Sequence, residues 1–119
     1  MQIIDESILQ KLKKPLLDSH KGDNGRVLVI AGSEKYHGAL LLAIRAASRL
    51  VDIVYVYTWE GNQRLVDTLK SETAVFINIK SDELWEKVGQ VDAILIGPGL
   101  EESENIKKIL AKILGKYYE

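Results

Sequence analysis

The sequence contains no cysteine and only two prolines, its acidic and basic side chains nearly cancel, and it has no apolar run long enough to span a membrane. The lack of cysteine excludes disulfide bonds and thiolate chemistry. A formal net charge of -1 provides no basic field to hold a nucleic acid backbone, which argues against sequence-independent nucleic-acid binding. Even the most apolar long segment, 38–50, contains arginines, so no membrane association is expected.

The first residues, MQIIDESILQKL, carry acidic side chains and lack a long apolar core. They therefore predict neither a signal peptide nor a transit peptide, and we expect a cytoplasmic protein. A length of 119 residues predicts one domain, 1–119, that is large enough to bury a hydrophobic core.

The stretch 26–50 organises the rest of the chain. Residues 27–31 (VLVIA) are an unbroken apolar run, which is typical of a parallel strand buried on both faces. A loop bounded by Gly32 and Gly38 follows, and the mostly apolar segment 38–50 predicts a helix. Strand, loop and helix make half of a βαβ unit, in which ligands bind where strand ends meet helix starts.

The remaining segments alternate in the same way. This alternation predicts an α/β fold with a mostly parallel sheet flanked by helices. The expected strands are 53–57, 73–79 and 93–96, the expected helices are 5–13, 63–69, 82–88 and an apolar stripe over 106–114, and 18–24 is expected to be a surface loop.

The loop from Gly32 to Ala39 is the first candidate binding site. Its glycines let the backbone approach a ligand closely, and the free N–H groups at the following helix start would attract an anion. The spacing fits neither the Rossmann nor the P-loop pattern. A tight turn that needs small residues only for packing is the alternative.

The triplet Gly97-Pro98-Gly99 is the second candidate site. Pro98 fixes one φ angle, and the flanking glycines keep side chains out of the space above the sheet, which would suit a flat ligand. A simple turn is again the alternative. Both loops follow predicted parallel strands, so we expect them at the same edge of the sheet, where together they favour a pocket.

Several single residues have more ordinary interpretations. His20 and His37 have no second ligand at metal-binding spacing, so no metal site is expected. Asp52 and Asp92 precede strands at the opposite edge and are interpreted as turn or cap residues. Trp85 is interpreted as a core or interface anchor.

Other residues lie nearer to the candidate loops. Trp59 would lie at the pocket edge, where packing is favoured over stacking on a ligand. Ser103 predicts an N-cap surrounded by acids, which would repel a phosphate and leave the helix start at Gly38 as the better anion site. Arg45 and Arg49 share a helix face, which would meet either solvent or the acids of a partner chain.

Taken together, five features resemble the NAD(P)H-hydrate dehydratases, carbohydrate-kinase-like enzymes of nicotinamide nucleotide repair. They are His20-Lys21-Gly22, Gly25, the run VLVIAGS over 27–33, Tyr36 with Gly38-Ala39, and IGPGL over 96–100. The resemblance extends over nearly all of this chain but only over the first half of the family's domain. It implies the N-terminal half of a ribokinase-like fold and a lyase reaction in which ADP or ATP supports the dehydration of NADHX or NADPHX.

The resemblance also implies a set of ligand-binding residues. They are Gly32, Ser33, Tyr36, Gly38, Ala39, Gly97, Pro98 and Gly99, with Ala39 and Gly99 as the best matches. The family's catalytic aspartate and phosphate loop lie in a later G-x-G-D segment, and nothing like it occurs here. The resemblance therefore implies no catalytic residue in this chain, and ADP or ATP with magnesium only if a complementary chain supplies that site.

Three explanations of the missing half stay open. The enzyme is split over two chains, or this chain is a non-catalytic nucleotide-binding or oligomerising module derived from the same fold, or the sequence is a shortened piece of a longer protein. The native-looking Met1 and the charged, aromatic tail make the third less attractive. Each explanation leaves a sheet edge and an apolar face to be covered, so we expect a homo-oligomer or a complementary chain.

Overall fold

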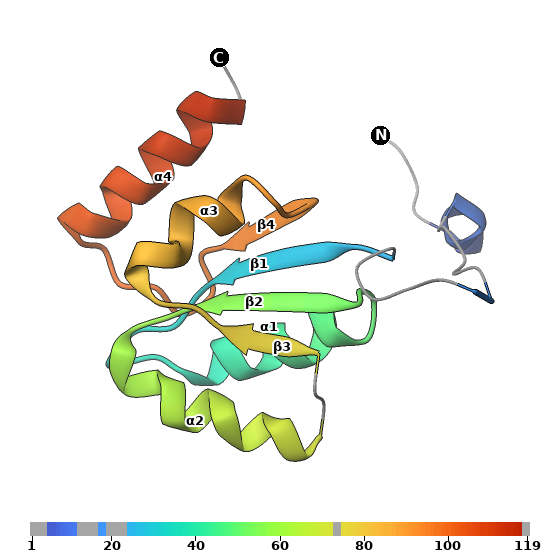
Figure 1. Ribbon diagram of the computed structural model, residues 1–119, viewed down its shortest axis with the longest axis horizontal. Helices are drawn as coiled ribbons and strands as arrows, with labels where there is room; N and C mark the ends of the chain where they lie inside the picture. The colour runs from blue at the N-terminus through green and yellow to red at the C-terminus, as the bar shows by residue number, and fades with distance from the viewer. Residues whose placement is uncertain (1–4, 12–16, 19–23, 73–74, 118–119) are drawn as a thin grey trace.

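A computed structural model describes residues 5–11, 17–18, 24–72 and 75–117 of the chain. It confirms an α/β fold in which strands and helices alternate (Figure 1). In chain order the elements, with η for a 3-10 helix, are η1 (Glu6–Lys11), β1 (Arg26–Ile30), α1 (Gly38–Ser48), β2 (Ile53–Tyr57), η2 (Glu60–Asn62), α2 (Gln63–Asp67), η3 (Thr68–Ser71), β3 (Phe76–Asn78), η4 (Ser81–Glu83), α3 (Leu84–Val88), β4 (Ala93–Ile96) and α4 (Glu104–Tyr117).

Several predicted elements are shorter than expected or of another type. The expected helix 5–13 is the 3-10 helix η1, with residues 12–13 outside the described part. Hydrogen bonds from the hydroxyl and backbone N–H of Ser7 lower the pKa of Asp5 at its start. The expected strand 73–79 is reduced to β3, with residues 73–74 outside the described part, and the helix 63–69 is divided between α2 and η3.

The four strands are all parallel, in the order β3-β2-β1-β4. The chain therefore moves outward from β1 through β2 to β3, and then returns across the sheet to add β4 on the free side of β1. After β1 the chain continues into α1 on one face of the sheet, and after β4 it continues into α4 on the other face. The boundary between β1 and β4 is therefore a switch point. In open α/β sheets such a switch point is where ligands bind, beyond the carboxyl ends of the strands.

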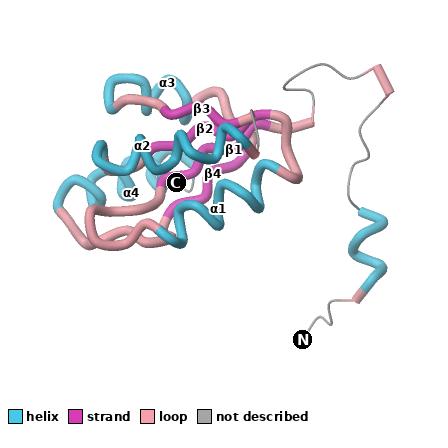
Figure 2. Tube along the Cα trace, turned by 90° about the horizontal axis from the view of Figure 1, so that it is seen from below, coloured by secondary structure: helices cyan, strands magenta, loops and turns pink. Residues whose placement is uncertain are grey.

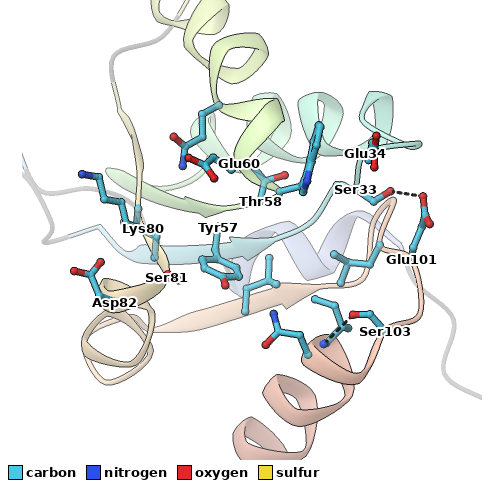
Figure 3. A pocket seen from close by; sticks show the side chains of 18 residues that line it. Ser33, Glu34, Tyr57, Thr58, Glu60, Lys80, Ser81, Asp82, Glu101 and Ser103 are labelled. Atoms are coloured by element: carbon cyan, nitrogen blue, oxygen red, sulfur yellow. Dashed lines mark hydrogen bonds between the residues drawn. The ribbon is translucent and has the colours of Figure 1, made fainter.

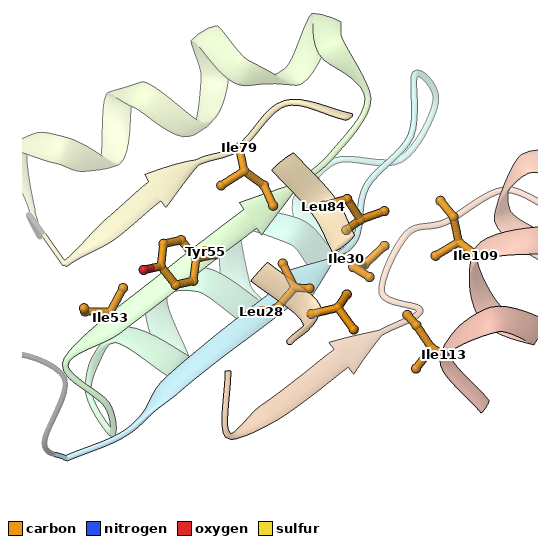
Figure 4. Close-up of a cluster of buried hydrophobic side chains, with 9 residues drawn as sticks. Leu28, Ile30, Ile53, Tyr55, Ile79, Leu84, Ile109 and Ile113 are labelled. Atoms are coloured by element: carbon orange, nitrogen blue, oxygen red, sulfur yellow. The ribbon is translucent and has the colours of Figure 1, made fainter. Parts of the chain in front are cut away.

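Helices cover both faces of the sheet. Figure 2, seen from below, shows α1 at the bottom and α3 at the top with the strands between them, and α1 and α2 share one face of the sheet. Alternate strand residues supply the two cores, because successive side chains in a strand point to opposite faces. The first core joins β1 and β2 to α3 and α4 (Figure 4) and contains Leu28, Ile30, Ile53, Tyr55, Ile79, Leu84, Val88, Ile109 and Ile113. The second joins the strands to α1 and α2 and contains Val29, Ala31, Leu40, Ile44, Val54, Val56, Val66, Leu69 and Phe76.

The turns at the amino edge of the sheet agree with the sequence. Asp52 accepts a hydrogen bond from the backbone N–H of Asn24 over 3.1 Å, and Asp92 accepts one from the N–H of Arg26 over 2.9 Å. Both carboxylates therefore fix the entry into β1. None of the helices in the described ranges has the length and apolarity needed to cross a bilayer.

Two interpretations of single residues are now decided. Arg45 binds Glu72 of the same chain through two hydrogen bonds of 3.0 Å while its side chain stays 47% exposed, so the expected contact with solvent is confirmed and the intrachain acid is an addition that the sequence did not predict. The reason is that η3 ends beside α1, a tertiary contact that sequence spacing does not encode. Trp85 packs against the first core with the ammonium of Lys112 4.1 Å from its ring centre, which makes it a core anchor.

Candidate binding site at the carboxyl edge of the sheet

The two candidate loops meet at the carboxyl edge, between β1 and β4. The N–H of Gly32 donates a hydrogen bond to the carbonyl oxygen of Pro98 over 2.8 Å, and the N–H of Gly97 donates to that of Ile30 over 3.1 Å. Their predicted placement at one edge of the sheet is therefore confirmed. The His20-Lys21-Gly22 motif lies outside the described residues.

Glycine is required at two positions of this junction for reasons of space. Gly32 has a φ of 76°, and a Cβ there would lie 2.8 Å from the Thr58 hydroxyl oxygen and 2.9 Å from a Leu40 methyl carbon. Gly99 has a φ of 68°, and a Cβ there would lie 3.0 Å from the backbone oxygen of Tyr36. The packing interpretation therefore accounts for both residues, and it leaves a ligand role open at each.

A buried asparagine joins the loop after β1 to the loop after β2. Asn62 is only 4% exposed, and its side-chain nitrogen donates hydrogen bonds to the backbone oxygen of Ser33 over 2.9 Å and to the hydroxyl oxygen of Thr58 over 3.3 Å. Asn62 could not be identified from the sequence, because a single asparagine in a polar loop carries no distinguishing pattern. Its role depends on β1 and β2 being neighbours.

Ser33 lies at the centre of the first loop. Its hydroxyl oxygen accepts a hydrogen bond from the N–H of Tyr36 over 3.1 Å, and its own N–H donates to the carbonyl oxygen of Tyr36 over 2.8 Å. The hydroxyl also donates to Glu101 over 3.3 Å, which links this loop to the segment that leads into α4. The first loop is thus a closed turn.

A pocket of about 690 Å³ opens beside this junction, over the ends of β1, β2 and β3 (Figure 3). Its volume lies within the usual range for small-molecule sites. The lining residues are Ile30, Gly32, Ser33, Glu34, Tyr57, Thr58, Trp59, Glu60, Gln63, Ile79, Lys80, Ser81, Asp82, Leu100, Glu101, Ser103, Asn105 and Ile106.

Only some of the predicted ligand-binding residues line the pocket. Gly32 and Ser33 line it, and Gly97 lines a smaller neighbouring hollow of about 260 Å³. The rest of the set, Tyr36, Gly38, Ala39, Pro98 and Gly99, lines neither of these two spaces. Trp59 lines the pocket, as predicted from the sequence. The other wall residues from the loops after β2 and β3 were not predicted, because the position of these loops beside β1 follows only from the strand order.

The pocket is rich in negative charge. Its carboxylates are those of Glu34, Glu60, Asp82 and Glu101, and its one ammonium group is that of Lys80 (Figure 3). Phosphate groups would therefore be repelled from most of its surface. Among the described residues no three histidines or acids are grouped so as to hold a metal ion.

The two helix starts near the pocket differ in their negative charge. The Ser103 hydroxyl accepts a hydrogen bond from the N–H of Ile106 over 3.2 Å, which confirms it as the N-cap of α4. Glu101, Glu102 and Glu104 surround that helix start. By contrast, the first turn of α1 contains no acidic residue and its N-cap, His37, makes no side-chain cap bond. Anion binding at α1 stays a prediction.

Comparison with known families agrees with this geometry. A family model described as NAD(P)H-hydrate dehydratase (Carb_kinase) matches residues 27–118, which include both loops and the pocket walls. The chain belongs to this dehydratase family. The resemblance on which the sequence interpretation rested is thereby confirmed.

Members of the dehydratase family and their structural neighbours are similar along most of this chain. The bifunctional NAD(P)H-hydrate repair enzyme of Methanocaldococcus jannaschii is 31% identical over 92% of the chain. A ribokinase-like superfamily protein of Enterococcus faecalis superposes with a TM-score of 0.78 and 27% identity over 96% of the chain. The ADP/ATP-dependent NAD(P)H-hydrate dehydratase of Bacillus subtilis, co-crystallised with ATP and Mg²⁺, gives 0.67 and 29% over 86%.

The matched region is most of this chain but less than half of each of these proteins. It covers 23% of the Methanocaldococcus enzyme, 41% of the Enterococcus protein and 38% of the Bacillus dehydratase. The sequence therefore corresponds to a part of the dehydratase domain with a ribokinase-like fold.

Proposed function

We propose that this chain is the substrate-binding half of an NAD(P)H-hydrate dehydratase, which acts on NADHX or NADPHX when the remainder of the domain is present. The observation that carries the proposal is the junction of Gly32 and Pro98 at the switch point of a sheet that belongs to the dehydratase family. The roles of Gly32, Ser33, Tyr36, Gly38, Ala39, Gly97, Pro98 and Gly99 in binding the dinucleotide are part of this proposal.

The chemistry of the described residues fits binding better than catalysis. Hydroxyl and amide groups around the pocket can donate and accept hydrogen bonds to ribose and carboxamide groups. No G-x-G-D segment occurs in the sequence. ADP or ATP with magnesium, which the names of the relatives specify, would therefore be held by the remainder of the domain. A cytoplasmic location is part of the same proposal.

A chimeric enzyme tests the proposal directly. The part of the Bacillus subtilis dehydratase that this chain matches would be replaced by residues 24–117 of this chain, and the recovery of NADH from NADHX would be measured with ADP or ATP. We expect phosphate-donor-dependent activity. A chimera that is folded, as judged by a cooperative thermal transition, but inactive would contradict the proposal and favour a non-catalytic module.

The same proposal names the place where the remainder of the domain would bind, the outer edge of β4. In the parallel register Leu95 is paired with Val29, so it belongs to the face that α1 and α2 cover, yet it is 41% exposed. On the other face a hollow is lined by the apolar residues Ile96, Leu100, Ile106 and Leu110, with Gly97, Glu101 and Glu102 at the same hollow. Apolar groups therefore flank this open edge on both sides, as is typical of an interface.

The opposite edge of the sheet differs. At β3 the side chain of Asn78 donates a hydrogen bond to Asp67 over 2.8 Å, and Lys70 pairs with Asp67 over 3.4 Å. Polar groups of this kind protect an edge from pairing. We therefore propose that the segment carrying the rest of the dehydratase domain adds a parallel strand at β4. A second copy of this chain at the same edge is the outcome that would contradict this assignment.

A further inference from the structure

We propose that Trp59 is the aromatic wall of the pocket on which a flat heteroaromatic ring of a nucleotide stacks. The inference rests on the proposed function, because it names the part of the dinucleotide that this pocket would hold. The ring is either the nicotinamide or the adenine, which share this chemistry.

Trp59 has the position of a binding residue. It lies two residues after the end of β2, in the loop that forms one wall of the pocket, and the residue is 47% exposed. An indole ring offers a large flat apolar surface, and stacking on a second ring would remove part of that surface from water. The other tryptophan, Trp85, packs instead against the core beneath Lys112.

The indole ring of Trp59 lies directly against Gly61. A Cβ atom at Gly61 would lie 2.7 Å from Cε3 of Trp59 and still nearer to two further atoms of its six-membered ring. Only glycine at this position therefore leaves room for the ring where it lies. A larger residue at 61 would displace the indole from its place in the wall.

Hydrogen bonds fix the backbone of the same loop. The carbonyl oxygen of Trp59 accepts a bond from the N–H of Asn62 over 2.8 Å, and the buried side chain of Asn62 is in turn bonded to Ser33. The backbone that carries the indole is therefore fixed without a ligand. Such preorganisation reduces the entropy lost on binding.

The charges around Trp59 select the ring rather than the phosphates. The pocket is lined by four carboxylates and one ammonium group, that of Lys80, so a pyrophosphate in this pocket would be repelled. The carboxylates are those of Glu34, Glu60, Asp82 and Glu101. A nucleobase or nicotinamide ring carries no negative charge and is not repelled. The geometry thus assigns the ring to the pocket and leaves the phosphates outside it.

Tryptophan fluorescence provides the first test, because the chain has two tryptophans in different surroundings. The Trp85→Phe variant reports Trp59 alone, and the Trp59→Phe variant reports Trp85 alone. AMP and nicotinamide mononucleotide would be titrated into each, with ribose phosphate as the ligand that lacks a ring. We expect saturable quenching of Trp59 by one of the ring-bearing ligands, no response of Trp85, and no quenching by ribose phosphate.

Affinity measurements provide the second test. For the ligand that quenches Trp59, we expect Trp59→Ala to weaken binding by about tenfold, the order expected for one stacked base, and Trp59→Phe to weaken it less. Gly61→Ala, which retains Trp59 but displaces its ring, is also expected to weaken binding. Thermal unfolding of each variant establishes that the fold is retained.

The outcomes separate this inference from the proposed function. Equal affinity of Trp59→Ala and the unchanged chain would overturn the stacking role, and an active chimera would then still support the dehydratase function. Ring-dependent quenching of Trp59 together with an inactive, folded chimera would support the stacking role and contradict the proposed function. Absence of quenching by both AMP and nicotinamide mononucleotide would overturn the inference.

Discussion

The N–H of Gly32 donates a 2.8 Å hydrogen bond to the carbonyl oxygen of Pro98, and this bond joins the turn after β1 to the turn after β4. The strands themselves are adjacent and parallel, so the bond continues their ladder beyond its last paired residues, Ile30 and Ile96. Two loops far apart in sequence thereby become one surface.

The glycines of this surface are expected to differ in their tolerance of alanine. Gly99→Ala forces an alanine to adopt a positive φ and brings its Cβ against a backbone oxygen. We therefore expect a loss of more than about 2 kcal/mol in the free energy of unfolding. Gly97→Ala has open space around it, but its φ of 134° is one that L side chains rarely adopt, so it should lose stability through backbone strain alone. Gly38→Ala is the matched control, since it has neither constraint and begins a helix, where alanine is favourable. Denaturant titration measures all three, and equal losses would refute this ranking.

Asn62 is expected to contribute to stability through its two hydrogen bonds. Asn62→Ala leaves the carbonyl oxygen of Ser33 without this donor in a poorly solvated place, so the free energy of unfolding should fall by about 1–3 kcal/mol. Asn105→Ala, at an exposed asparagine that lines the pocket, should change it by less than about 0.5 kcal/mol. Similar values for the two variants in urea denaturation would contradict a structural role for Asn62.

The strands and the two glycine loops could be predicted because their signals are local. The runs 53–57 and 93–96 are apolar segments that became β2 and β4 without change of bounds. Of the pocket walls, the place of Trp59 at the pocket edge was predicted from the sequence, and the wall after β3 was not. Trp59 and Lys80 follow different strands, and only the order β3-β2-β1 brings their loops together. The pair Arg45 and Glu72 likewise depends on how η3 packs beside α1.

Ser103 is expected to stabilise the start of α4. Ser103→Ala removes the acceptor for the N–H of Ile106 and should lower the free energy of unfolding by about 1 kcal/mol. Ser103→Asn, which retains a capping oxygen, should recover most of this loss. Ser81→Ala serves as the control, because Ser81 is an exposed serine that lines the same pocket. Thermal denaturation compares the three, and failure of asparagine to rescue would argue against capping.

The pair Arg45 and Glu72 is expected to contribute little, despite its two hydrogen bonds. Their side chains are 47% and 53% exposed, so water and salt screen the attraction. A double-mutant cycle with Arg45→Ala and Glu72→Ala should give a coupling free energy below about 1 kcal/mol, and it should decrease as salt is added. A larger coupling that does not respond to salt would show that the pair orders η3 against α1.

The two edges of the sheet are expected to respond differently to a charge. Leu95 on β4 and Ile77 on β3 are similarly exposed, at 41% and 43%, which makes them a matched pair. Leu95→Lys places an ammonium group within the apolar surroundings of β4 and should abolish association with a polypeptide that carries the rest of a dehydratase domain. Ile77→Lys should leave that association unchanged, because polar groups already flank β3. Size-exclusion chromatography of the mixtures with light scattering measures both. Loss of association in the Ile77 variant alone would place the interface at β3 instead.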